Sequence, residues 1–63
     1  MRQIQIAGET VNYTHERVFG SPQEAVAFRE GVEFYYNESF SVVGILERNG
    51  QYSVFMFDED SAE

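Results

Sequence analysis

The sequence contains no cysteine and no lysine, and its positive charge comes from four arginines alone. Without cysteine, no disulfide can stabilise the fold. Nucleic acids and anionic membranes are bound through clustered lysine and arginine, so the shortage of both argues against direct binding to either. No apolar run approaches the roughly 18 residues of a membrane span, and the alternating start Met-Arg-Gln-Ile-Gln-Ile is unlike a signal peptide. We therefore expect a cytoplasmic protein.

The chain is rich in apolar and acidic residues. It has 63 residues, of which 43% are hydrophobic and 16% aromatic, which is too apolar for a disordered tail. Eleven acidic residues against four basic ones give a net charge of −7. A chain this short buries only about 60% of its unfolded surface. We expect one small acidic domain over residues 1–63, held by tight packing or by self-association.

The first region has the two-residue period of half-buried strands. Ile4 and Ile6 alternate with glutamines, and Val11 and Tyr13 alternate with polar residues. Gly8-Glu9 suits a type II′ turn, because glycine accepts the positive φ of its first central position. The predicted hairpin places Ile6 opposite Val11 and Ile4 opposite Tyr13, with all four side chains on one face.

The segment Gly20-Ser21-Pro22-Gln23-Glu24 predicts the start of a helix. Ser21 suits the N-cap, Pro22 the first helical position, and Glu24 the capping box and the helix dipole. At 100° per residue, a helix from Pro22 to Tyr36 gathers one apolar face. The members of that face are Ala25, Phe28, Val32, Tyr35 and Tyr36.

Gly31 leaves an alternative for this region, because glycine inside a helix costs up to about 1 kcal/mol relative to alanine. The helix ends at Gly31 in that alternative, and residues 32–36 form a strand. We favour the long helix because its apolar face continues in phase past Gly31.

A second hairpin is predicted from residues 40–47 and 51–57, joined by Asn49-Gly50, the preferred pair of a type I′ turn. Its register pairs Ile45 with Val54, Gly44 with Phe55, Val43 with Met56 and Val42 with Phe57. Both faces of this hairpin are apolar, so we expect its strands to be central. Residues 58–63 are expected to form an acidic, flexible tail.

These elements predict an α+β fold of β-hairpin, α-helix and β-hairpin (ββαββ), with a four-stranded, mainly antiparallel sheet and one helix packed on one face. One helix covers one face only. The other face is either an interface or is covered by the first hairpin or by residues 37–41. We favour the interface. Its apolar candidates are Phe34 on the outer side of the helix, and Val42, Leu46, Phe55 and Phe57 on the sheet.

No catalytic, metal or cofactor motif stands out. His15 is the single histidine, no G-x-S-x-G elbow is present, and the glycines are too isolated for a phosphate-binding loop. Asp58-Glu59-Asp60 lacks the glycine that follows in a calcium loop. We therefore predict a non-enzymatic protein-binding module without a cofactor or metal.

Two functions fit these features. The first is an acidic inhibitor or decoy that blocks a basic nucleic-acid-binding surface on a partner protein. Its acidic face would comprise Glu30, Glu33, Glu38, Asp58, Glu59 and Asp60. In size, charge and architecture alone, the chain resembles small phage-encoded inhibitors, including anti-CRISPR proteins and DNA mimics, which act in the host cytoplasm. The alternative is a homodimeric accessory or regulatory subunit that self-associates through an apolar sheet or helix face.

Overall fold

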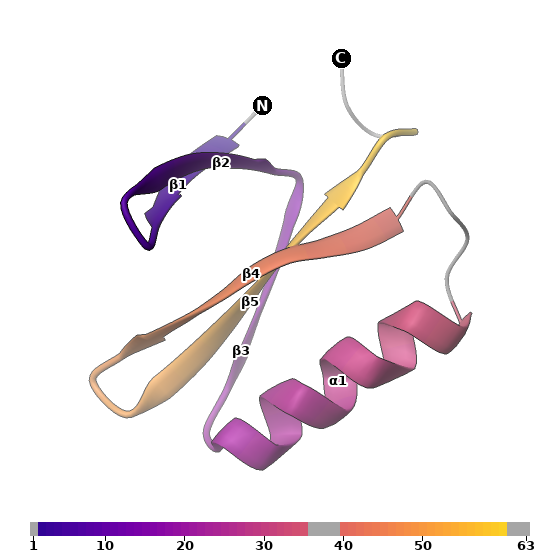
Figure 1. The fold of residues 1–63 in the computed structure, drawn as a ribbon. Coiled ribbons are helices and arrows are strands. Elements are labelled where there is room, and N and C mark those ends of the chain that lie inside the picture. The colour runs from indigo at the N-terminus through magenta and orange to yellow at the C-terminus, as the bar shows by residue number, and fades with distance from the viewer. Residues whose placement is uncertain (1, 36–39, 61–63) are drawn as a thin grey trace.

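The structure is a computed structural model that describes residues 2–35 and 40–60, with the side chains of residues 33–35 excepted. Five strands and one helix follow one another in these residues. They are β1 (Arg2–Ile6), β2 (Glu9–Tyr13), β3 (His15–Phe19), α1 (Pro22–Tyr35), β4 (Phe40–Arg48) and β5 (Gln51–Asp58). The predicted α+β class is confirmed (Figure 1).

The strands form two antiparallel sheets, so the predicted single four-stranded sheet is wrong. β1 and β2 pair with each other, and a separate sheet has the order β3-β5-β4. The prediction missed β3, which follows β2 after a bend at Thr14 and pairs along β5 from His15 opposite Met56 to Phe19 opposite Tyr52. β3 has the sequence His-Glu-Arg-Val-Phe, in which polar and apolar residues do not alternate, so its strand signal is weak in the sequence.

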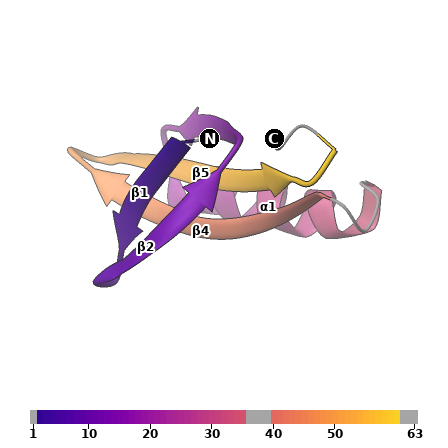
Figure 2. The same ribbon diagram turned by 90° about the horizontal axis from the view of Figure 1, so that it is seen from above.

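The elements lie in three layers. Helix α1 contacts all three strands of the β3-β5-β4 sheet from one side, while β1 and β2 contact that sheet from the other side (Figures 1 and 2). The rings of Tyr13 on β2 and Phe55 on β5 meet edge to face, with centroids 4.9 Å apart. Ile6 at the end of β1 lies directly over Gly44 on β4. The first hairpin thus covers the sheet face that α1 leaves open.

The turn of the first hairpin differs from the predicted one. Its central residues are Ala7 and Gly8, both with positive φ (53° and 81°), as a type I′ turn requires. Ile6 therefore lies opposite Glu9 and Ile4 opposite Val11. The shift amounts to two residues, the period of a strand, so the apolar residues still share one face as predicted.

Helix α1 begins as predicted, with the Glu24 N–H donating to Ser21 Oγ at 3.2 Å. It continues through Gly31 to Tyr35, which confirms the long helix. Ala25 and Val32 are buried on its inner face, and half-buried Phe28 lies there too. Tyr36, the predicted last residue, lies outside the described residues.

The second hairpin confirms the predicted type I′ turn, because Asn49 and Gly50 have φ of 53° and 79°. The register holds from the turn to Gly44 opposite Phe55. Beyond it a β-bulge at Val43 breaks the register, so the predicted pairs of Val43 with Met56 and of Val42 with Phe57 are wrong. A bulge inserts one extra residue and reverses which face the following side chains occupy.

The bulge decides how the core on the α1 side is filled. Val42 lies opposite Met56 and Phe40 opposite Asp58. As a result, Val42 and Phe40 pack on the buried cluster of Ala25, Val54 and Met56. In the predicted register, Val42 would have faced the other side of the sheet. The bulge therefore adds an aliphatic and an aromatic side chain to the core that one helix covers.

The acidic segment after β5 is ordered further than predicted. Asp58 belongs to β5, and its N–H donates to Thr14 Oγ1 at 2.9 Å. The Asp60 N–H donates to Asp58 Oδ1 at 3.0 Å. Of the predicted tail, Asp58 thus lies in β5 and residues 59–60 form a turn, while residues 61–63 lie outside the described part of the chain.

The contact of Ile6 with Gly44 predicts a coupled mutational effect. A methyl group at Gly44 would overlap Ile6 Cδ1, so we expect Gly44→Ala to lower the free energy of unfolding by about 1–3 kcal/mol. In an Ile6→Val chain, which lacks that atom, the same substitution should cost at least about 0.5 kcal/mol less. Urea unfolding measures both values.

Gly20→Ala is the control, because no side chain or distant backbone lies within 4 Å of its added methyl group. An equal cost of Gly44→Ala in both chains would contradict the packing of the first hairpin on the sheet.

Candidate functional site

The predicted open sheet face is covered by the chain itself. Phe55, a candidate for the apolar interface, has 0% exposure. Tyr13 packs on its ring, and Ile6 packs beside it over Gly44. Of the two alternatives, the first hairpin folding over the sheet is the one observed. Phe55 therefore cannot contact a partner while the chain is folded.

The other apolar candidates do not gather into one exposed patch. Val42 is half-buried and packs on the α1-side core. Leu46 and Phe57 are also half-buried, and the side chain of Phe34 lies outside the described residues. The large hydrophobic residues that are most exposed are Val18 on β3 and Val26 on α1, at 53% and 39%. They lie on opposite sides of the sheet.

Several predicted acidic residues lie at one end of the molecule. Asp58 is half-buried, and Glu59 and Asp60 after it are exposed. In Figure 1 β5 ends at the upper right and α1 at the lower right, so their C-terminal ends lie on the same side of the molecule but apart from each other. We call this side the acidic end, defined by residues 58–60 and the last turn of α1. Glu30 is exposed on the outer face of α1. Glu33 belongs to α1 without a described side chain, and Glu38 lies outside the described residues.

The helix adds to the negative potential of the acidic end. The last turn of α1 holds no basic residue, whereas the first turn holds Glu24. A helix carries about half a negative charge at its C-terminus. That partial charge is therefore not compensated within the helix and has the same sign as the neighbouring carboxylates.

Three of the four arginines are engaged in contacts on other elements, and one of them, Arg2, reaches Thr14, which also bonds Asp58. Arg48 forms an ion pair with Glu16 at 3.6 Å. Arg2 donates to the Thr14 carbonyl at 2.8 Å and lies over the Tyr13 ring. Arg17 lies over the Phe28 ring, 5.4 Å from its centroid. These contacts hold the three arginines on β1, β3 and β4, whereas residues 58–60 are three consecutive acidic residues.

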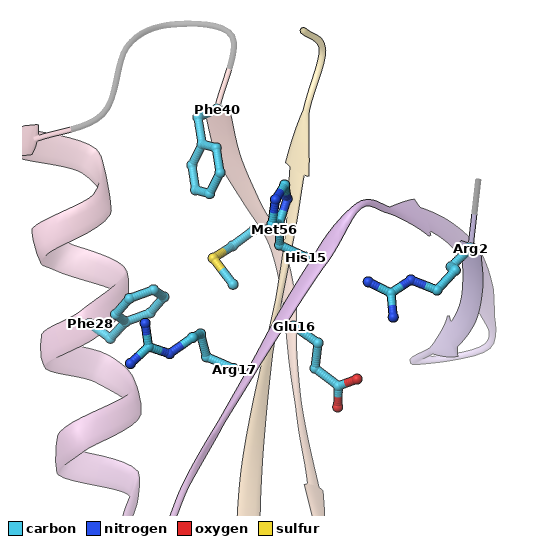
Figure 3. A pocket seen from close by; sticks show the side chains of 7 residues that line it. All are labelled: Arg2, His15, Glu16, Arg17, Phe28, Phe40 and Met56. Atoms are coloured by element: carbon cyan, nitrogen blue, oxygen red, sulfur yellow. The ribbon is translucent and has the colours of Figure 1, made fainter. Parts of the chain in front are cut away.

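A cavity of about 370 Å³ lies beside the edge strand β3, and it was not predicted from the sequence. His15 and Arg17 on β3, Phe28 on α1, Phe40 on β4 and Met56 on β5 line it from the α1 side of the sheet (Figure 3). Glu16 and Arg2 lie across β3 from them. These residues are distant in sequence, and only the pairing of β3 with β5 brings them together.

The described residues contain no group of three or more histidine, cysteine or acidic side chains that could hold a metal ion. His15 Nδ1 lies 2.8 Å from Thr14 Oγ1.

In the part of the chain that is described, no helix has the length and apolar character to cross a bilayer.

Burial of Phe55 predicts that an acidic substitution there unfolds the chain. Phe55→Asp would bury a carboxylate without a partner, at a cost of more than about 4 kcal/mol, which is most of the stability of a small domain. We expect its circular dichroism at 25 °C to be that of an unfolded chain. Val18→Asp on the same sheet face is the matched control, because Val18 is 53% exposed. A folded Phe55→Asp protein would contradict the covered face.

No protein-family model, no curated protein and no solved structure matches the chain. A functional assignment therefore rests on the geometry described above.

Proposed function

We propose that the chain is a non-enzymatic, cytoplasmic inhibitor that uses its acidic end to occupy a basic nucleic-acid-binding surface on a partner protein. The observation that carries the proposal is the uneven charge. Residues 58–60 are three consecutive acidic residues at the end of β5, the last turn of α1 lies on the same side of the molecule, and no arginine lies in either segment.

The arrangement suits a phosphate-like surface. Asp58 is held in β5 through its N–H bond to Thr14 Oγ1, and its own Oδ1 accepts the Asp60 N–H. The acidic side chains are therefore carried on ordered backbone, which lowers the entropy lost on binding. The net charge of −7 would steer the molecule toward a positive surface and speed association.

The alternative function, a homodimeric subunit, has less support from the structure. The sheet face that would have formed the dimer is covered by β1 and β2. Exposed Val26 beside Ala27 remains on the outer face of α1. A single exposed valine is ordinary on a protein surface, so we do not favour self-association.

The test compares two variants of equal charge. The acidic-end variant is Asp58→Asn, Glu59→Gln, Asp60→Asn, in which the new amide at position 58 retains an acceptor oxygen for the turn at residue 60. The control variant is Glu9→Gln, Glu24→Gln, Glu47→Gln, which neutralises residues of the two hairpin turns and the start of α1. Each changes the net charge from −7 to −4. Immobilised proteins capture partners from a nuclease-treated lysate of the source organism.

We expect the wild type and the control to retain a nucleic-acid-binding protein that added duplex DNA displaces. Binding should weaken steeply as salt rises, because screening removes the charge attraction. The acidic-end variant should bind that protein at least tenfold more weakly, a loss on the order of 1.4 kcal/mol. Undiminished binding by the acidic-end variant, or no displacement by DNA, would refute the proposal.

A further inference from the structure

We propose that the cavity beside β3 binds a small aromatic carboxylate, with the aromatic ring against Phe28, Phe40 and Met56 and the carboxylate at Arg17 and His15. The lining of this cavity contains no residue of the acidic end, although Phe40 lies opposite Asp58 on the neighbouring strand. The two proposals are tested with different ligands and different variants.

The size and lining of the cavity fit a small ligand. Its volume of about 370 Å³ lies within the range of about 300–1,000 Å³ typical of ligand pockets. Met56 is 2% exposed and forms part of the core. Phe28 and Phe40 are half-buried; the Arg17 guanidinium lies over the Phe28 ring, and the His15 ring lies 5.7 Å from that of Phe40. An aromatic ligand would find apolar and ring surfaces from three different elements.

The charge at the cavity has the opposite sign to that of the whole protein. Two of the four arginines and the only histidine line it, together with Glu16 as the sole acidic residue among its described lining. Glu16 is paired with Arg48, which lies outside the cavity. With His15 neutral, the lining still carries one excess positive charge in a chain of net charge −7.

Arg17 is the residue best placed to hold an anion. Its guanidinium lies over the Phe28 ring and forms no ion pair with a described residue. Its position opposite Val54 and that of His15 opposite Met56 place both on the α1 face of the sheet. An arginine stacked on a ring keeps its N–H donors in the guanidinium plane, where they can contact a carboxylate bidentately. A direct contact between the Arg17 guanidinium and a bound carboxylate is much shorter than about 8 Å, the distance beyond which salt screens charges at physiological ionic strength. The attraction should therefore persist at that salt concentration.

The experiment titrates the ¹⁵N-labelled protein with 2-naphthoate and, separately, with its neutral analogue 2-naphthamide, following amide chemical shifts at about 0.15 M NaCl. We expect naphthoate to shift the amides of His15, Arg17 and Phe28. Naphthamide should bind at least tenfold more weakly, because it lacks the charge. Equal binding of the two ligands, shifts confined to other regions, or no shift at millimolar ligand would overturn the proposal.

Arg17→Gln should weaken naphthoate binding about tenfold, and Arg17→Lys should restore only part of it, because lysine keeps the charge but lacks the planar pair of donors. Arg29→Gln is the matched control, since Arg29 is an exposed arginine on α1 that does not line the cavity. An equal loss in Arg29→Gln would mean that net charge and not the cavity controls binding, and would refute the site. If Arg17→Gln does not fold, the comparison of the two ligands on the wild type still decides the question.

Discussion

The fold depends on covering both faces of a sheet whose central strand is apolar on both sides. β5 places Val54 and Met56 under α1 and Phe55 under the first hairpin, and all three have 2% exposure or less. A single helix shelters one face only. The hairpin of β1 and β2 therefore covers the other face, with Tyr13 packed on Phe55 and Ile6 over Gly44. Hydrogen bonds of Thr14, directly after β2, to Met56 and Asp58 on β5 also hold it there.

The local elements of the fold could be predicted from the sequence, but their assembly could not. The cap at Ser21, the Asn49-Gly50 turn and the alternation of Ile4 and Ile6 act within a few residues, so each was visible. β3 is an edge strand with exposed Arg17, and its pairing with β5 joins segments far apart in the chain. The bulge at Val43 follows from how the side chains fill the core, which no local pattern encodes.

The candidate sites, like the fold, could be predicted from the sequence only in part. The acidic residues at the end of β5 were predicted from the sequence, but their place on the same side of the molecule as the end of α1 comes from the tertiary fold. The prediction that Phe55 lies at an interface was wrong. A sequence can show more apolar residues than one helix covers, but it does not show which segment covers the rest. The cavity beside β3 could not be predicted at all, since His15, Phe28 and Met56 meet only through long-range packing.

The covered sheet face is tested most directly by nuclear Overhauser measurements on the free protein. The account predicts cross-peaks between the Ile6 methyl groups and the Gly44 α-protons, and between the Tyr13 and Phe55 rings, at a concentration where light scattering gives the mass of one chain. Absence of both sets of cross-peaks in the folded protein would contradict the account. Cross-peaks that arise only between differently labelled copies of the chain would also contradict the account. The hairpin that covers the sheet would then belong to a second molecule.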